Sequence, residues 1–579
     1  MASKKSENAP LIEFTVSMPR PLSHNFKVTA KVSGDEGGEF KVAFAAWTPG
    51  SYKIRDFARN VSDFGAAKGA KFELLDKQSY RLTGAGMVEF SYTLYADELS
   101  VRTPHLDDTH GFFLGSNLFP YLVGEDGKPA PCRYRITVVP YGDWKVATSL
   151  EPVRGVANCW QAPDYDILAD TPFEIGTHSI HSFTAFGVKH RVAFYGWGNF
   201  DEKRIVADTE KVVNKIAAAF GGVPYSSYLF INHFTPDSGG GLEHLNSCVC
   251  AWPSFKNVKE DDYQRFIRLV SHEYFHVFNV KRIRPEILGP FDYSKEQHTK
   301  ALWVMEGLTQ YYERLWCARA GVTPAETLLD SYSELFERED ARPGRKRMSL
   351  EDSSWLAWTK LYQADENFAN SAISYYSRGA QIGFLLDAKI RKLTGGKKSL
   401  DDVLRLALKR YGYPKPGFAE RGFEKMCEEV TGKSLSAFWR AHVRGTRELD
   451  YAEALDLYGL KLERTAEGDT PWLGFGTGVK DGRFEISHVL DDSPAAAAGL
   501  QARDEVLAVN HFKVTADDFD NRSNELRPGV TAIVTVFRRG RLIDHKVKVG
   551  KRPAGRLKLR PKKTQTAAQM KNYRRWLGR

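Results

Sequence analysis

The sequence predicts a multidomain α+β protein, in which an antiparallel β domain is followed by a mostly helical domain and then by a small domain of short strands. Three observations lead to this prediction. The chain has 579 residues, which exceeds the size of one ordinary domain. Apolar residues recur at every second position up to about residue 185 and follow a helical period from about residue 200. From about residue 455 the pattern returns to short strands.

The N-terminal part of the chain shows the alternation that is typical of a sheet with one buried face. Two runs carry apolar residues at every second position: Ile12, Phe14, Val16 and Met18, and then Phe26, Val28, Ala30 and Val32. Turn residues such as Thr48-Pro49-Gly50 separate successive runs. We therefore expect an antiparallel β domain over residues 1–190.

Residues 191–454 are expected to form the helical domain. The segments with a helical period are 202–220, 261–281, 300–320, 324–338, 373–393, 400–411 and 420–443. Residues 455–550 are expected to form the domain of short strands, ending with strands at 531–537 and 545–549. Residues 551–579 are expected to form a basic tail.

The formal charge of +10 is a property of this C-terminal segment. Residues 551–579 contain eleven Lys or Arg and no Asp or Glu, so the first 550 residues carry a net charge of −1. A solvated tail is the simpler interpretation, and contact with RNA or an anionic surface is the alternative. Because the body is neutral, nucleic-acid binding is not expected except through this tail.

Composition and targeting signals favour a cytoplasmic globular protein. Hydrophobic residues make up 42% of the chain and aromatic residues 12%, which suits large cores. The start of the chain shows no secretory signal, and no stretch is long enough to span a bilayer. The six cysteines are scattered, unlike those of a disulfide scaffold.

Residues 272–276 carry the pattern His-Glu-x-x-His. Residues four apart on a helix lie one above the other, so His272 and His276 can bind one metal ion. Glu273 projects beside them, where it can act on a metal-bound water as general base. The apolar stripe of this helix lies on nearly the opposite side, which is not typical of core histidines. A pair of surface histidines is the alternative interpretation.

A catalytic zinc site needs a third protein ligand, and Glu306 is the candidate. It follows five apolar residues, 301–305, so its carboxylate is expected to be buried. A buried carboxylate requires a partner charge or a metal. An ion pair with an arginine is the structural alternative to metal binding.

These segments resemble the glycyl aminopeptidase family. The resemblance rests on His-Glu-Tyr-Phe-His at 272–276, Val-Lys-Arg-Ile-Arg-Pro at 280–285, Leu-Trp-Val-Met-Glu-Gly-Leu-Thr-Gln-Tyr-Tyr at 302–312 and Trp-Thr-Pro-Gly-Ser-Tyr-Lys-Ile-Arg-Asp at 47–56. It implies a thermolysin-like catalytic domain over 191–454, one zinc ion per chain and removal of small N-terminal residues such as Gly or Ala. A PDZ domain usually accompanies it. The gap of 29 residues between His276 and Glu306 is longer than in the related alanyl-type aminopeptidases.

Two further segments are similar to the alanyl-type enzymes. Gly240-Gly241-Leu242-Glu243-His244 resembles the strand whose glutamate binds the free α-amino group of the substrate, which implies this role for Glu243. Tyr375-Tyr376-Ser377-Arg378-Gly379 resembles the element whose tyrosine stabilises the oxyanion, which implies this role for Tyr376, with Tyr375 as the adjacent alternative. A surface carboxylate and packed tyrosines are the structural interpretations.

The C-terminal domain resembles a PDZ domain. The resemblance rests on Trp-Leu-Gly-Phe-Gly at 472–476, Asp-Ser-Pro-Ala-Ala-Ala-Ala-Gly-Leu at 492–500 and Asp-Glu-Val-Leu-Ala-Val-Asn at 504–510. It implies a site for the C-terminus of a peptide at Leu473, Gly474, Phe475 and Gly476. The sequence departs from the usual pattern at Arg503 and His511, where glycine is common, while Asn510 can adopt the left-handed turn.

One further cluster contains metal-ligand types. His-Leu-Asp-Asp-Thr-His at 105–110 offers ligands for a second metal, but a polar loop is the favoured interpretation. For the whole chain, peptide substrates and a zinc aminopeptidase are predicted. A zinc endopeptidase and a non-catalytic PDZ adaptor are the two alternatives.

Overall fold

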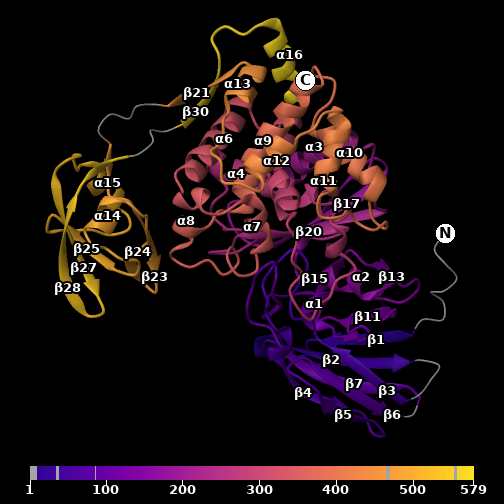
Figure 1. Cartoon of the computed structure of the whole chain (residues 1–579). Helices are drawn as coiled ribbons and strands as arrows, with labels where there is room; N and C mark the ends of the chain where they lie inside the picture. Colours follow the sequence, from indigo (N-terminus) through magenta and orange to yellow (C-terminus); the bar gives the residue numbers. More distant parts are fainter. Residues whose placement is uncertain (1–9, 34–37, 85, 465–469, 553–556) are drawn as a thin grey trace. The chain divides into compact units, whose positions relative to one another are not determined.

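A computed structural model describes residues 10–33, 38–84, 86–464, 470–552 and 557–579 (Figure 1). The first nine residues, on which the prediction of no secretory signal partly rests, lie outside the described residues, as do 553–556 of the predicted tail. The chain divides into two compact units. The first comprises Met1–Thr299, Tyr312–Thr323 and Asp401–Phe423, and the second comprises Lys300–Tyr311, Pro324–Leu400 and Glu424–Arg579.

A seven-stranded sheet opens the first unit and confirms the predicted β domain (Figure 1). Its strands, in spatial order, are β13 (Glu151–Pro152), β14 (Cys159–Ala162), β11 (Arg133–Val139), β1 (Leu11–Ser17), β2 (Asn25–Ser33), β7 (Val88–Tyr95) and β4 (Val61–Ala66). The alternating residues Phe14 and Val16 of β1 and Phe26 and Val28 of β2 are buried in its core. Neighbouring strands are antiparallel, except that β1 and β11 are parallel.

Two four-stranded sheets accompany it in the first unit. One has the order β10 (Tyr121–Leu122), β3 (Gly38–Ala43), β6 (Ser79–Gly84) and β5 (Lys71–Leu74). The other has the order β12 (Lys145–Thr148), β15 (Pro172–Gly176), β9 (His110–Leu114) and β8 (His105–Leu106). Two short helices belong to the same region: α1 (Gly115–Leu118) follows β9 in sequence, and α2 (Tyr165–Ala169) precedes β15.

A five-stranded sheet contains Glu243, the predicted substrate-binding residue, at the end of its edge strand. Its order is β16 (Ser179–Ala185), β17 (Val188–Gly196), β18 (Ser227–Phe234), β20 (Ser247–Trp252) and β19 (Gly240–Glu243). Strands β17, β18 and β20 are parallel, and β19 runs antiparallel at the edge. Helix α3 (Glu202–Phe220) has the predicted bounds, with Asp201 capping its N-terminus.

Helix α4 (Glu260–Phe275) ends six residues before the predicted 281. The reason is local. The ring Nδ1 of His276 lies 2.6 Å from the carbonyl oxygen of Asn279, and the amide of Val277 already bonds three residues back, to Tyr274. These bonds turn the chain out of the helix directly after the His-Glu-x-x-His segment.

The second unit contains α6 (Ala325–Asp340) and α9 (Tyr375–Leu393), which match predicted segments, and α12 (Ser436–His442), which lies within one. It also contains three short helices that the sequence did not predict, α7 (Leu350–Trp355), α8 (Phe368–Ser371) and α13 (Ala452–Tyr458). The predicted helix 300–320 begins with a π-helical turn, η5 (Trp303–Gly307), before α5 (Leu308–Arg319). The predicted helix 420–443 is broken at Gly432, whose φ of +63° separates α11 (Gly422–Thr431) from α12. Helix α10 (Leu400–Tyr411), in turn, has the predicted bounds.

The C-terminal domain of short strands is built on one β-sheet and has its own hydrophobic core. The order is β23 (Phe475–Lys480), β24 (Arg483–Val489), β25 (Glu505–Val509), β27 (Thr531–Arg538) and β28 (Arg541–Lys548), with β26 (Phe512–Lys513) paired to β25. Two short helices, α14 (Pro494–Ala497) and α15 (Phe519–Asn524), complete it. Strand β23 lies at one edge of this sheet.

The prediction of a solvated basic tail is wrong for the described part of residues 551–579. Strand β30 (Leu557–Pro561) pairs with β21 (Leu460–Arg464), and helix α16 (Ala567–Trp576) packs beside α13 in the second unit (Figure 1). The indole of Trp576 is fully buried and donates to the Tyr311 hydroxyl at 2.8 Å. Four apolar residues of the described part of the segment are buried: Leu557, Leu559, Trp576 and Leu577. The basic composition therefore does not prevent the segment from folding.

Among the described residues, none of the helices combines the length and the apolar character that crossing a bilayer requires. All six cysteines are buried and free.

Candidate active site

Helix α4 places His272, Glu273 and His276 next to one another within the protein. Their exposed fractions are 9%, 4% and 1%, so the alternative of two surface histidines is excluded. The predicted apolar stripe is buried on the other side, at Tyr263, Phe266, Ile267 and Val270. The end of α4 is therefore enclosed on all sides, and its polar face lies in an interior site.

The Nδ1 atom of each imidazole has a specific partner. Nδ1 of His272 lies 2.6 Å from Oε2 of Glu313, and Nδ1 of His276 lies 2.6 Å from the carbonyl oxygen of Asn279. A carbonyl oxygen only accepts, so His276 donates from Nδ1 and its Nε2 carries the lone pair when the ring is neutral. This is the arrangement in which metal-binding histidines are oriented by a second partner.

Glu313 is held in its charged form. Burial raises the pKa of its carboxyl group, but the Arg314 guanidinium, the hydrogen bond with His272 and the charge of Arg268 together lower it below its usual value. Glu313 also forms an ion pair with Arg314. An ionised Glu313 favours the neutral, Nδ1-protonated form of His272 once a cation occupies the other side of the ring.

Strand β19 brings a second carboxylate to the same place. Glu243 is 4% exposed. One carboxylate oxygen each of Glu243 and Glu273 and one ring nitrogen of His276, the atoms that could bind a metal, lie within 4.8 Å of one another. The strand passes close to Glu273, since a Cβ atom on Gly241 would lie 2.1 Å from Oε1 of Glu273. The carbonyl oxygen of Gly241 accepts a hydrogen bond from Nη2 of Arg102 at 3.0 Å.

The segment with the sequence Trp-Thr-Pro-Gly-Ser-Tyr also reaches Glu243. A Cβ atom on Gly50 would lie 2.7 Å from Oε1 of Glu243, and Gly50 has a φ of +85°. A small cavity opens here. It is lined by Trp47, Pro49, Gly50, Tyr52, Glu243, Val280, Lys281, Arg284, Leu288 and Phe291. Glu243 therefore lies between the His-Glu-x-x-His helix and a small, largely apolar space.

Asp170 anchors the loop that follows Glu243. Its carboxylate accepts from the amide of Leu245 at 2.7 Å and from Nζ of Lys281 at 2.7 Å, and it lies 3.2 Å from Nδ1 of His244. Burial raises the pKa of Asp170, but the charges of Lys281 and His244 outweigh it and lower the pKa. Lys281 thus forms a buried ion pair with Asp170.

The second unit holds Glu306 and the two tyrosines. Glu306 is 2% exposed and lies in η5. This turn packs backbone to backbone on α9, because a Cβ atom on Gly307 would lie 2.6 Å from the Cα of Gly379. Burial raises the pKa of the Tyr376 hydroxyl well above its usual value, and the negative charge of Glu306 raises it further.

Tyr375 and Tyr376 differ in their surroundings. Tyr375 is fully buried, whereas Tyr376 is partly exposed, with its hydroxyl 3.4 Å from that of Tyr362. The two rings stack with centroids 4.7 Å apart. Because a substrate can reach only a residue with exposed surface, Tyr376 stays the predicted oxyanion residue, and Tyr375 is a packed side chain.

The predicted peptide-binding segment of the C-terminal domain begins in its core. Leu473 is 7% exposed, and Gly474 has a φ of +84° and would meet Ser493 at 2.2 Å if it carried a Cβ atom. Phe475 starts the edge strand β23 and contacts Phe519 of α15, with ring centroids 5.7 Å apart. An edge strand beside a helix is where strand addition takes place in PDZ domains.

Two residues beside the site, Glu313 and Arg102, were not predicted from the sequence. A signal for Glu313 was present, since it follows Glu306 by seven residues, or about two helical turns. No local signal points to Arg102, which comes from the N-terminal β domain and meets β19 only through the fold. Gly50 lies in the predicted turn at 48–50, but its close approach to Glu243 was not predicted.

Comparisons with known proteins agree with this arrangement. A family model described as M61 glycyl aminopeptidase matches residues 265–382, and the Peptidase M61 N-terminal domain matches residues 13–177. A PDZ domain model matches residues 471–549. A comparison with curated proteins found no match.

Among solved structures, the chain is similar to an aminopeptidase N family protein from Idiomarina loihiensis. The identity is 27%, the TM-score is 0.90, and the match covers 98% of this chain and 100% of that one. An M1 zinc metallopeptidase mutant from Deinococcus radiodurans matches at 15% identity with a TM-score of 0.47, over 76% of this chain and 95% of that one. Yeast LTA4 hydrolase with bestatin matches at 14% with the same TM-score, over 76% and 68%.

The two regions that match the M61 models together contain Gly50, His272, Glu273, His276 and Glu306. The protein is a peptidase whose N-terminal and catalytic regions match the models of the M61 glycyl aminopeptidase family and whose C-terminal domain matches a PDZ domain.

Proposed function

We propose that this peptidase is a zinc-dependent aminopeptidase in which His272, His276 and Glu306 hold one zinc ion. His272 and His276 are buried at the end of α4, and Glu306 is buried in η5. Two imidazoles and one carboxylate are the ligand set of a catalytic zinc with one open position. The donor set fits the ion, because Glu313 and Asn279 occupy Nδ1 of the two histidines and leave Nε2 for the metal.

When bound, the ion would polarise a water molecule and the substrate carbonyl and would bring the pKa of the water to about 7. Glu273 is proposed to accept the proton of the attacking water and to deliver a proton to the leaving amine. Its burial and the close approach of Gly241 restrict the positions that its carboxylate can adopt. Tyr376 is proposed to donate a hydrogen bond to the developing oxyanion, and its raised pKa keeps the hydroxyl protonated.

Glu243 is proposed to bind the free α-amino group of the substrate. The observation that carries the aminopeptidase proposal is the proximity of Glu243, Glu273 and His276, whose donor atoms lie within 4.8 Å of one another. A carboxylate that pairs with the ammonium group at this distance from the base limits cleavage to the first peptide bond. The small cavity beside Glu243, with Gly50 and Trp47 in its wall, supports a preference for small first residues such as Gly or Ala.

We propose two further properties. The PDZ domain binds the C-terminus of a peptide through Leu473, Gly474, Phe475 and Gly476. The protein works in a reducing compartment such as the cytoplasm, which the six buried, free cysteines support.

The test compares free and N-acetylated alanyl and glycyl peptides as substrates of the wild type and of Glu243→Gln. The proposal predicts that only free peptides are cleaved and that Glu243→Gln raises KM for them. Glu125→Gln, an exposed carboxylate, is the matched control and should behave as wild type. Internal cleavage of acetylated peptides would establish an endopeptidase instead. A zinc-loaded protein that cleaves nothing but binds peptides would favour an adaptor.

A further inference from the structure

A group of ionisable side chains lies at the end of an apolar layer in the first unit, apart from the candidate active site. The layer contains Phe112 and Leu114 of β9 together with Leu229 and Ile231 of β18. Alternation along β18 continues this face to His233, and alternation along β9 continues it to His110. Glu174 of β15 pairs with Phe112 in the strand register. Three strands therefore place an ionisable residue where an apolar one would continue the layer.

These three residues are enclosed. Glu174 and His110 have no exposed surface, and His233 is 1% exposed. A charged carboxylate in such a place costs several kcal/mol unless partners compensate for the lost water. Its one hydrogen bond among the described residues joins Oε2 to Nε2 of His233 at 2.8 Å.

Several buried polar atoms of the group lack a hydrogen-bond partner among the described residues. They are Oε1 of Glu174, Nδ1 of His233 and both ring nitrogens of His110. Donor atoms of His110, Glu174 and His233 nevertheless lie within 4.8 Å of one another. Buried polar atoms are rarely left unsatisfied, so three side chains that converge with orphan atoms point to a ligand held between them.

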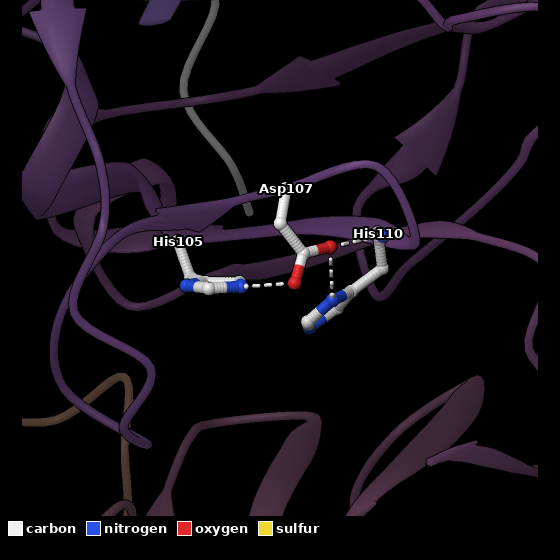
Figure 2. A group of neighbouring side chains, drawn as sticks. All are labelled: His105, Asp107 and His110. Atoms are coloured by element: carbon white, nitrogen blue, oxygen red, sulfur yellow. Dashed lines mark hydrogen bonds and ion pairs between the residues drawn. The ribbon is translucent and has the colours of Figure 1, made fainter. Parts of the chain in front are cut away.

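A neighbouring group shares His110 but is explained by hydrogen bonds alone. Figure 2 shows His105, Asp107 and His110, and both nitrogens of His105 already have partners, Asp97 at 2.9 Å and Asp107 at 3.1 Å. Asp107 also accepts from the amide and the hydroxyl of Thr109. The prediction of a polar loop at 105–110 is confirmed only for residues 107–109, because His105 and His110 lie in strands β8 and β9 and are buried.

Asp107 orients the ring of His110. Its Oδ1 lies 3.7 Å from Nδ1 of His110 (Figure 2). The ring of His110 also stacks on that of Tyr195, with centroids 3.4 Å apart. A carboxylate behind a histidine is the usual second partner of a metal-binding imidazole. Nε2 of His110 is then the nitrogen available to a ligand.

We propose that His110, Glu174 and His233 bind a second zinc ion, which is structural. Two imidazole nitrogens and one carboxylate oxygen suit zinc and do not suit calcium or magnesium, which prefer oxygen ligands. A water molecule would complete four ligands. The ion would replace the missing partners of the three side chains and join β9 and β15 to β18.

All three proposed ligands are buried. The ion would lie away from solvent, so no catalytic role is assigned to it.

The experiment counts zinc in the purified full-length chain by mass spectrometry, using the double variant His272→Gln/His276→Gln to remove the catalytic ion. The proposal predicts that this variant keeps one equivalent and that adding His110→Gln and His233→Gln removes it. His105→Gln is the matched control and should keep the equivalent, because His105 is a hydrogen-bonding residue here. A folded double variant without zinc would overturn the second site, whatever the wild type binds.

Cobalt substitution provides a second measurement if the variants of the buried histidines do not fold. A wild type that binds two cobalt ions, one of which resists removal by chelators, upholds the proposal. A wild type that binds no cobalt, or whose bound cobalt is all removed by chelators, overturns it. Loss of peptidase activity does not enter either readout, so failure of the proposed function and failure of this site are distinguishable.

Discussion

Gly241 and Glu273 lie so close together that a methyl group on Gly241 would come within 2.1 Å of Oε1 of Glu273. The edge strand β19 and the end of helix α4 thus meet at the predicted general base. Only glycine leaves room for the Glu273 carboxylate at this position. The glycine-rich sequence at 239–241 is therefore explained by packing against the catalytic helix as well as by a turn.

The first prediction concerns this contact. Gly241→Ala should displace the Glu273 carboxylate and reduce kcat on the order of a hundredfold or more, because proton transfer by a positioned base contributes factors of this size. Zinc content should be unchanged. Gly239→Ala is the matched control, since no atom lies within 4 Å of its added methyl group. Equal activities of the two variants would contradict the contact.

The second prediction concerns Glu313, which orients His272. Glu313→Gln removes the charge behind the imidazole and should weaken zinc binding roughly ten- to a hundredfold. A competition titration with a chelator measures this change. Glu326→Gln, at an exposed carboxylate, should leave the zinc affinity unchanged. An unaltered affinity of Glu313→Gln, with the thermal midpoint also unaltered, would show that Glu313 does not support the metal site.

The third prediction concerns the turn between β25 and β26. Asn510 and His511 form a two-residue connection in which both have positive φ, +51° and +64°. This conformation favours Asn-Gly, and a side chain at the second position costs about 1 kcal/mol. His511→Gly should therefore stabilise the PDZ domain by about 1 kcal/mol, and His511→Asn by less. Urea unfolding measures the difference, and destabilisation by glycine would refute the explanation.

The fourth prediction concerns pH. Burial, together with the negative charge of nearby Asp164, raises the pKa of Asp166 from 3.8 to about 6. Because the folded state binds this proton more tightly than the unfolded state, the group stabilises folding fully below about pH 4, and this contribution falls away as the pH rises through 6.

Between pH 4 and pH 7, the free energy of unfolding of the wild type should therefore fall by about 2 kcal/mol relative to that of Asp166→Asn. The Tyr293 hydroxyl donates to Oδ1 of Asp166 at 2.8 Å, and the amide of asparagine can still accept this bond. Denaturant titrations of both proteins across this range provide the comparison. Parallel pH profiles would show that Asp166 is not the titrating group.

The sequence predicted a helix or strand well where the spacing of apolar or functional residues within that one segment is enough to indicate it. The alternation around Phe14 and Phe26 gives β1 and β2, and the spacing of His272 and His276 gives the face of α4. Pairings between distant segments carry no such signal. The parallel pairing of β1 with β11 joins Leu11 to Arg133, which no local pattern indicates.

Contacts between residues that are far apart in the sequence could not be predicted from local patterns either. Gly50 and Arg102 reach β19 from the N-terminal domain, and His110 and His233 meet although 123 positions separate them in the sequence. Composition misled at the C-terminus. The lysines and arginines of residues 557–577 suggested a tail, whereas the few apolar side chains, above all Trp576, decide the packing.

The role of Glu273 as the general base is tested by measuring peptide hydrolysis and bound zinc in the same samples of wild type and Glu273→Gln. We expect the variant to keep its zinc and to lose at least a hundredfold in kcat on free alanyl and glycyl peptides. Glu273→Gln preserves the size of the side chain beside Gly241, so a loss of activity would report the missing base. A zinc-loaded variant with wild-type activity would contradict the assignment of Glu273 and with it the proposed mechanism.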